Sequence, residues 1–257
     1  MGCQRILFLN TDLEIGGTPT VVRELACRLN QSRTSADNFE VEVACLAPWG
    51  PVADQLRQRG VRVTCFGARG IGDWRIIPKL IAHIRARRID TIFSFLIHAN
   101  AAATVAGLAC GGVRLFQSIQ STAADPRWHW RLQGVLWRAA EAMIVPSQSI
   151  SSALQRRSRV PAGKIIVIPN AVDADDFPRS LVPQSNPRPR PYPIAFIGRL
   201  DPIKRIGDLL AAVARLGGLV HLHIFGYGPR EQHLREETRR LNIAALVSFE
   251  GRIERPQ

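Results

Sequence analysis

The chain has 257 residues, 46% of them hydrophobic, which is enough for one large domain or two modest ones. It carries 34 basic and 21 acidic side chains, a net charge of +13 that favours anionic partners such as phosphorylated small molecules, nucleic acid or an acidic membrane surface. No apolar run reaches the roughly 18 residues that span a bilayer, and the first ten residues lack the features of a signal peptide. We therefore expect a cytoplasmic protein.

The cysteines support the same compartment. They are odd in number, lie in apolar segments and show no metal-ligand spacing, so we expect buried, reduced thiols and no metal site. The five are Cys3, Cys27, Cys45, Cys65 and Cys110.

Strand-like and helix-like segments alternate along the first 170 residues. This alternation predicts βα units around a parallel sheet, which binds its ligands beyond the carboxyl ends of the strands. The predicted strands are 5–10, 39–47, 61–66, 90–96, 113–119, 142–147 and 164–170, and the predicted helices are 16–30 (with a glycine-rich turn), 52–60, 76–88, 99–110 and 128–141.

A proline-rich stretch then interrupts the pattern. Residues 178–193, PRSLVPQSNPRPRPYP, contain six prolines and are predicted to be an extended linker. The alternation restarts after it, with helices expected at 205–216 and 229–242. The predicted organisation is a first domain over 1–177, the linker, and the start of a second domain over 194–257.

The turn GRLDPIK, after the strand PIAFI, is a candidate anion site. Gly198 lets the backbone approach a ligand, Arg199 can bind phosphate oxygens in two places, and Lys204 adds a charge beside a helix N-terminus. This combination suits a diphosphate. The alternative is an ordinary βα turn with solvated charges.

Two further glycine-containing turns follow strands. Gly16 and Gly17 precede Thr18, a candidate N-cap, and Pro19, which suits the first helical position. Gly226 follows the strand LVHLHIF. Each turn could bring backbone amides to a ligand or could be a tight turn before a helix.

His98 and Asn100 follow the fourth predicted strand, where ligands are expected to bind. His98 is a candidate catalytic residue, with a capping or packing role as the alternative, and Asn100 is a second polar candidate. His221 and His223 alternate with apolar residues and are expected to be sheet residues.

A basic aromatic stretch, PRWHWRLQGVLWR, occupies residues 126–138. Its tryptophans are expected to pack on the sheet while its arginines face solvent. The alternative is that it lies on an anionic membrane, because Trp and Arg both favour the interface.

Taken in order, these motifs resemble the retaining glycosyltransferases of family 4, which have the two-domain GT-B fold. The matching stretches are GGTPTVVRELACRL, VPSQSI, IPNAVD, FIGRLDPIKR and IFGYGP. The resemblance implies two Rossmann-like domains, no metal, and a UDP-, GDP- or similar nucleotide-sugar donor. It implies a glycan or lipid-linked acceptor, in the synthesis of cell-surface polysaccharide or glycolipid.

The resemblance also implies roles for the candidate residues. Arg199 and Lys204 would hold the donor diphosphate and stabilise the leaving nucleotide, with Gly198 and Gly226 beside them. Gly16 and Gly17 would line the cleft from the first domain, and His98 would contact the sugar.

The chain departs from the family in its second domain. The family continues with a Glu-x7-Glu segment that binds the ribose and the donor sugar, and Glu250 and Glu254 are too close together to replace it. We therefore expect a fragment with weak turnover, or one completed in trans. The alternative functions are an inactive binding or scaffold module that needs a partner chain and, from charge alone, a nucleic-acid binder, which no RNA-binding module or zinc finger supports.

Overall fold

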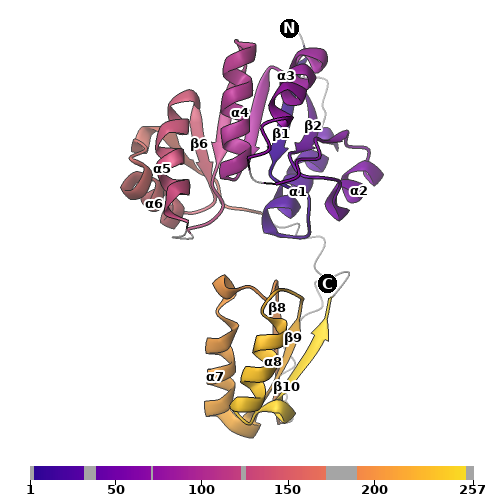
Figure 1. Ribbon diagram of the computed structural model, residues 1–257, viewed down its shortest axis with the longest axis vertical. Helices are drawn as coiled ribbons and strands as arrows, with labels where there is room; N and C mark the ends of the chain where they lie inside the picture. The colour runs from indigo at the N-terminus through magenta and orange to yellow at the C-terminus, as the bar shows by residue number, and fades with distance from the viewer. Residues whose placement is uncertain (1–2, 32–38, 71, 123–125, 172–189, 253–257) are drawn as a thin grey trace. The chain divides into compact units, whose positions relative to one another are not determined.

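The computed structural model describes residues 3–31, 39–70, 72–122, 126–171 and 190–252. The chain divides into two compact units, residues 1–171 and 172–257, and each is described by itself (Figure 1). Residues 178–189 of the predicted linker and Glu254 lie outside the described part. The last two linker residues, Tyr192 and Pro193, belong to the first strand of the second unit.

The first unit is built on a parallel sheet of seven strands, in the order β3-β2-β1-β4-β5-β6-β7. The order reverses between β1 and β4, which is the topological switch point where such sheets bind ligands. The strands are β1 (Gln4–Asn10), β2 (Phe39–Cys45), β3 (Val63–Cys65), β4 (Thr91–Phe95), β5 (Arg114–Ser118), β6 (Ala142–Val145) and β7 (Ile165–Val167).

Helices cover both faces of this sheet. Successive residues of β1 point to opposite faces, so Leu7 packs with Leu80 in α3 and Ala103 in α4, whereas Phe8 packs with the α1 and α2 side. This two-sided burial explains why the strands read as continuous apolar runs. The helices are α1 (Gly17–Gln31), α2 (Pro51–Gln58), α3 (Ile76–Arg87), α4 (Ile97–Cys110), α5 (Arg127–Leu136) and α6 (Gln148–Ser158), with 3-10 turns η1 (Trp137–Ala139) and η2 (Ala162–Lys164).

Two local features differ from the sequence prediction. Helix α6 was not predicted, although Ser147 caps it by accepting a hydrogen bond from the Ile150 amide at 3.3 Å. Helix α1 begins at Gly17, so Thr18 lies inside its first turn and does not cap it. Pro19 is tolerated at the third position because amides in the first turn have no intrahelical acceptor.

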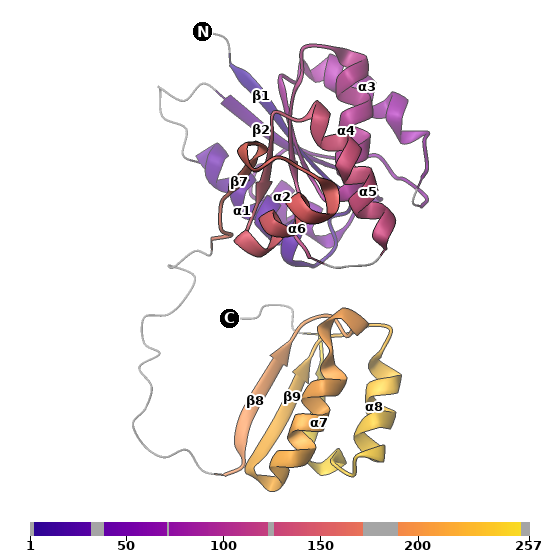
Figure 2. The ribbon, with the colours of Figure 1, turned by 90° about the vertical axis from the view of Figure 1, so that its left-hand side faces the viewer.

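The second unit is a smaller α/β layer. Its three parallel strands have the order β10-β9-β8, and both helices lie on the same face of the sheet (Figures 1 and 2). Leu210 of α7 and Leu234 of α8 pack there against Leu222 and Ile224 of β9. The elements are β8 (Tyr192–Ile197), η4 (Pro202–Lys204), α7 (Ile206–Leu216), η5 (Gly217–Leu219), β9 (Val220–Phe225), α8 (Glu231–Arg240), η6 (Ala244–Leu246) and β10 (Val247–Gly251).

The side chains of the cysteines and of two histidines can now be placed. All five cysteines are free, as predicted, but Cys3 is exposed and only Cys27 and Cys45 are fully buried. His221 and His223 are sheet residues, as expected, with partners in β10: Ser248 at 2.8 Å and Glu250 at 2.8 Å.

Candidate functional site

The switch point of the first sheet brings two of the predicted regions to one edge. Asn10, the last residue of β1, is opposite Phe95, the last residue of β4, in the parallel register. The glycine-rich turn follows the first of these strands and His98 follows the second. The carboxyl edge between β1 and β4 therefore carries Gly16, Gly17 and His98.

Two polar residues at this edge were missed by the sequence analysis. Asn10 is fully buried and accepts a hydrogen bond from the Thr11 amide, while its Nδ2 and the Thr11 Oγ1 have no partner among the described residues. Buried polar groups are almost always hydrogen-bonded, so unpaired ones indicate a place where a ligand or water binds. The signal was available in the sequence as Asn-Thr-Asp directly after an apolar strand.

His98 occupies the first turn of α4, after Leu96 with its positive φ of 73°. Its Nε2 is buried and unpaired within the described part of the chain. The imidazole packs against two rings of α5, with centroids 5.9 Å from Trp128 and 5.3 Å from His129. Burial lowers the pKa of His98 below its usual value, so the ring is neutral near pH 7 and can exchange hydrogen bonds with a neutral sugar.

The glycines near this edge of the sheet differ in whether the structure gives a steric reason for them. Gly16 accepts the first helical hydrogen bond of α1, from Thr20, and a Cβ on Gly17 would meet no described residue within 4 Å. Packing therefore does not explain a glycine at 17, and its predicted role beside a ligand stays a prediction. Gly50 is different, because its Cβ would lie 2.6 Å from the Leu13 carbonyl oxygen, so the loop after β2 must carry glycine there.

Asn100 is not available to a ligand. It is fully buried and accepts a hydrogen bond from Ser94 at 2.8 Å, while its amide donates to Gln133 at 2.9 Å and to the Ser118 carbonyl at 3.2 Å. These bonds connect α4 to β4, β5 and α5. The sequence-based suggestion of a polar contact at Asn100 is therefore replaced by a structural role.

The second unit carries the other candidate glycines. Gly198 follows β8, and Gly226 follows β9 with a φ of 144°. A Cβ on Gly226 would lie 1.9 Å from the Gly198 carbonyl oxygen. Glycine at 226 is therefore required by the contact between the two loops, whatever ligand binds nearby.

The two predicted cations differ in their surroundings. The Arg199 guanidinium is 61% exposed and forms an ion pair with Asp201, with Nε and Nη2 at 2.7 and 2.6 Å from Oδ2. Lys204 is exposed at the end of η4, and only Arg205 separates it from α7. An anion at this turn could pair with Lys204 directly. To pair with Arg199 it would have to share the guanidinium with Asp201 or replace Asp201 as its partner.

A third cation lies at the same loops and was missed in the sequence. The Arg230 amide donates to the Leu200 carbonyl at 3.1 Å, which places this residue beside the turn of Arg199. Its side-chain Nε is buried and unpaired among the described residues. Its only signal in the sequence was the Gly-Pro-Arg tripeptide that begins at Gly228.

Helix α5 combines core and surface aromatic residues. Trp130 is buried, as predicted, but Trp128 is 44% exposed. The arginines Arg127, Arg131 and Arg138 face solvent. The predicted packing of the tryptophans is therefore right for Trp130 and wrong for Trp128.

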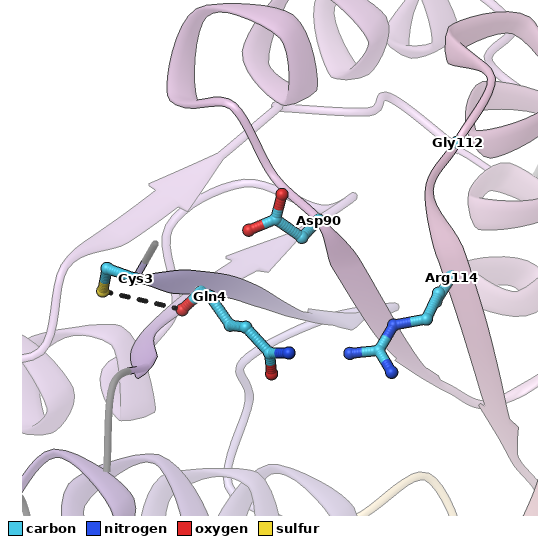
Figure 3. Close-up of a pocket in the computed structure, with 5 residues that line it drawn as sticks. All are labelled: Cys3, Gln4, Asp90, Gly112 and Arg114. Atoms are coloured by element: carbon cyan, nitrogen blue, oxygen red, sulfur yellow. Dashed lines mark hydrogen bonds between the residues drawn. The ribbon is translucent and has the colours of Figure 1, made fainter. Parts of the chain in front are cut away.

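A hollow at the opposite edge of the first sheet is not part of this site. It is lined by Cys3, Gln4, Asp90, Gly112 and Arg114, at the amino ends of β1, β4 and β5 (Figure 3). Asp90 is engaged with the Arg5 amide at 2.8 Å, and Arg114 donates to Thr91 at 3.1 Å. Ligands of parallel sheets bind at the carboxyl edge instead.

Comparison with solved structures defines the class of the fold. The chain is similar to the Anabaena protein Alr3699/HepE in complex with UDP-glucose (TM-score 0.80, 19% identity, covering 97% of this chain and 69% of that one). It is also similar to the apo lipopolysaccharide outer core galactosyltransferase WaaB (0.71, 17%, 98% and 69%) and to sucrose-phosphate synthase from Thermosynechococcus elongatus (0.72, 16%, 97% and 71%). The fold is that of the GT-B glycosyltransferases.

The family follows from the sequence of the first unit. The family description Glycosyltransferase Family 4 matches residues 15–176, well over half of the chain. The chain therefore belongs to Glycosyltransferase Family 4, which confirms the resemblance found in its motifs. No curated protein matches it significantly.

Proposed function

We propose that the protein transfers a sugar from a nucleotide-diphosphate sugar, with UDP, GDP or a similar nucleotide, to a glycan or lipid-linked acceptor. We infer retention of the anomeric configuration and a role in cell-surface polysaccharide or glycolipid synthesis. Membership of the family and the likeness to a structure holding UDP-glucose support the donor class. The main structural observation in favour of this donor class is the pair of exposed cations, Arg199 and Lys204, at the turn between β8 and α7.

The proposed reaction breaks the bond between the anomeric carbon and the diphosphate and joins that carbon to an acceptor hydroxyl oxygen, whose proton is lost. Negative charge grows on the departing nucleotide, and Arg199 and Lys204 are placed to stabilise it. In this proposal the two side chains supply the positive charge, and no metal is required. Gly198 and Gly226 position the turn.

The proposal also assigns roles to residues of the first unit. Gly16 and Gly17 bring backbone close to the donor, and neutral His98 exchanges a hydrogen bond with the sugar through its unpaired Nε2. Asn10 and Thr11 add polar atoms at the same edge of the sheet.

A peripheral contact with an anionic membrane, at the cytoplasmic face, is part of the proposal. Exposed Trp128 and Val135 lie on α5 with Arg131, and exposed Arg138 follows in η1, a combination that suits an anionic interface. Such a contact would bring the protein to a lipid-linked acceptor. Among the described residues, no helix has the length and apolar character to cross a membrane.

Calorimetric titration with a panel of nucleoside diphosphates and their sugars tests the donor site. We expect one nucleotide to bind and Arg199→Ala and Lys204→Ala each to weaken it about tenfold or more, because a charge-assisted hydrogen bond contributes about 1.5–3 kcal/mol. Arg215→Ala, at the far end of α7, is the matched control and should bind normally. Asp201→Asn should tighten binding, because it frees the Arg199 guanidinium.

Two results would count against the donor site. Equal binding by the Arg199→Ala and Arg215→Ala variants would show that the nucleotide binds elsewhere. No nucleotide binding by a chain with native circular dichroism would favour the alternative, a binding module that needs a partner chain.

A further inference from the structure

Two free cysteines face each other at the edge of the first sheet that carries the glycine-rich turn. Cys45 ends β2, Cys65 ends β3, and the two residues are opposite each other in the parallel register. Their sulfur atoms are 3.2 Å apart, with the Cys45 thiol donating to Cys65. Both side chains pack on the α1 and α2 side of the sheet, Cys45 fully buried and Cys65 half-buried.

The backbone geometry at this pair is compatible with a covalent bond. Neighbouring strands lie about 4.8 Å apart, and disulfides join Cα atoms about 4.4–6.8 Å apart. The side chains already point to the same face, so bond formation needs a side-chain adjustment and no rearrangement of the strands.

The two thiols are chemically unequal. The hydrogen bond from Cys45 lowers the pKa of Cys65 despite its partial burial. The same hydrogen bond, together with burial, raises the pKa of Cys45 above its usual value. Cys65 is therefore the more acidic and more accessible thiol, and Cys45 keeps the shared proton.

We propose that Cys45 and Cys65 form a dithiol modification site that hydrogen peroxide oxidises to a disulfide. Cys65 ionises, its thiolate attacks one peroxide oxygen, the O–O bond breaks, and the departing hydroxide takes up the proton that Cys65 released to give water. Cys45 then attacks the sulfenic sulfur of Cys65, the S–O bond breaks, and a second water leaves with the Cys45 proton. The two sulfurs together lose two electrons, which reduce the peroxide.

Oxidation of the pair affects the loop after β1 through the backbone that follows Cys45. The Cys45 sulfur also lies 3.3 Å from the Ala47 carbonyl oxygen and 3.8 Å from that of Pro48, so the side-chain adjustment that closes the disulfide changes its contacts with these two carbonyls. The amides of Leu46 and Ala47 donate to the carbonyls of Asn10 and Thr11 at 3.1 and 3.0 Å. A disulfide therefore weakens the support of the segment that leads to Gly16. The proposal depends on the first unit alone and not on the proposed function.

Peroxide treatment of the whole chain, followed by peptide mapping, tests the proposal. Arg57, Arg59 and Arg62 separate the two cysteines, so trypsin places them on different peptides unless a disulfide joins them. We expect the joined peptide, the loss of two titratable thiols, and recovery of both with dithiothreitol. Hydrogen exchange should increase at residues 11–16 and 46–49 of the oxidised chain.

Matched cysteine variants test whether disulfide formation is specific to Cys45 and Cys65. Cys45→Ser and Cys65→Ser should abolish the joined peptide, whereas Cys27→Ser and Cys110→Ser should keep it. Joining should be at least about tenfold faster in the native chain than in urea, because the fold holds the thiols together. Equal rates in native and unfolded chains, or Cys65 oxidised to sulfinic acid without the joined peptide, would overturn the proposal. The peptide mapping and the comparison of native and urea-unfolded rates use the unsubstituted chain, so they test the proposal even if a variant fails to fold.

Discussion

Gly226 is the residue whose backbone leaves the least room for a side chain. Its φ of 144° is a conformation that L side chains rarely adopt, and its Cα faces the Gly198 carbonyl at a distance that excludes any Cβ. The Gly226 amide also donates to the Gly251 carbonyl at 2.6 Å. One residue thus fixes the loop after β9 against the loop that carries Arg199.

Replacing this glycine should destabilise the second unit. We expect Gly226→Ala to cost about 3 kcal/mol or more, because it combines overpacking with backbone strain. Hydrogen exchange of the amides in β8 and β9 measures the effect without depending on the first unit. Gly218→Ala is the control, since its Cβ would meet nothing within 4 Å and its φ is not positive. Similar protection in the two variants would contradict the steric argument.

At the scale of single elements, β2 carries a buried charge that an apolar strand would not be expected to contain. Glu42 is 4% exposed, and its carboxylate lies 2.5 Å from His83 Nε2 and 3.1 Å from Arg87 Nε, both in α3. Burial alone would raise the pKa of Glu42, but the hydrogen bonds and charges of His83 and Arg87 outweigh it and lower the pKa. The carboxylate therefore holds α3 to the sheet.

Neutralising this carboxylate should weaken the first unit. Glu42→Gln is expected to lower the free energy of unfolding by about 2 kcal/mol at pH 7, because it leaves the partly buried His83 and Arg87 without their charged acceptor. Since the folded pKa is lowered, this stabilisation is present above the unfolded pKa of about 4.3 and is lost as the pH falls through the folded value. The difference between the variant and the parent chain should therefore shrink in acid.

Tryptophan fluorescence in a urea titration is a suitable measurement, because all five tryptophans lie within residues 1–171. Glu40→Gln is the matched control: Glu40 is on the same strand, at a partly exposed position paired with Arg62 at 3.3 Å. If the two variants are equally stable, the buried pair does not stabilise the fold.

The elements show which sequence signals are reliable. Apolar runs predicted the seven strands of the first unit, because strands covered by helices on both faces are apolar on both faces. The runs PIAFI and LVHLHIF likewise predicted β8 and β9 of the second unit. Helix α6 was overlooked, although Ser147 and the spacing of Ile150 and Leu154 marked it. The predicted cap of α1 was misplaced by two residues, because Thr18 is as good a capping residue as Gly16 and propensity alone does not decide between them.

Only part of the candidate site could be predicted from the sequence. Glycines and cations after strands predicted the loops, since topology alone places them at the carboxyl edge. The Arg199–Asp201 ion pair and the unpaired atoms of Asn10, Thr11 and Arg230 depend on three-dimensional packing, which no spacing rule contains. Burial likewise distinguished Asn100 from His98, two residues that look equivalent in the sequence.

At the scale of the whole molecule, the net charge of +13 predicts attraction to anionic surfaces. We expect binding to vesicles with anionic lipid that weakens with salt. The double variant Arg131→Glu and Arg138→Glu should reduce it tenfold or more, at about 1 kcal/mol per arginine. Sedimentation with vesicles measures this.

The control for this experiment is the double variant Arg239→Glu and Arg240→Glu, in the last turn of α8, which changes the net charge equally. Equal losses in the two double variants would show that overall charge, and not the surface of α5, attracts the lipid. Binding that resists high salt would instead indicate insertion of apolar side chains such as Trp128.

The position of β1 has a consequence for synthesis on the ribosome. β1 is made first, yet one of its two neighbours, β4, begins only at Thr91. Until then the nascent chain can assemble β1, β2 and β3, but the other side of β1 remains an open edge of apolar sequence. Nascent chains arrested before residue 91 should therefore depend on chaperones, and those arrested after the ribosome has released β4 should not.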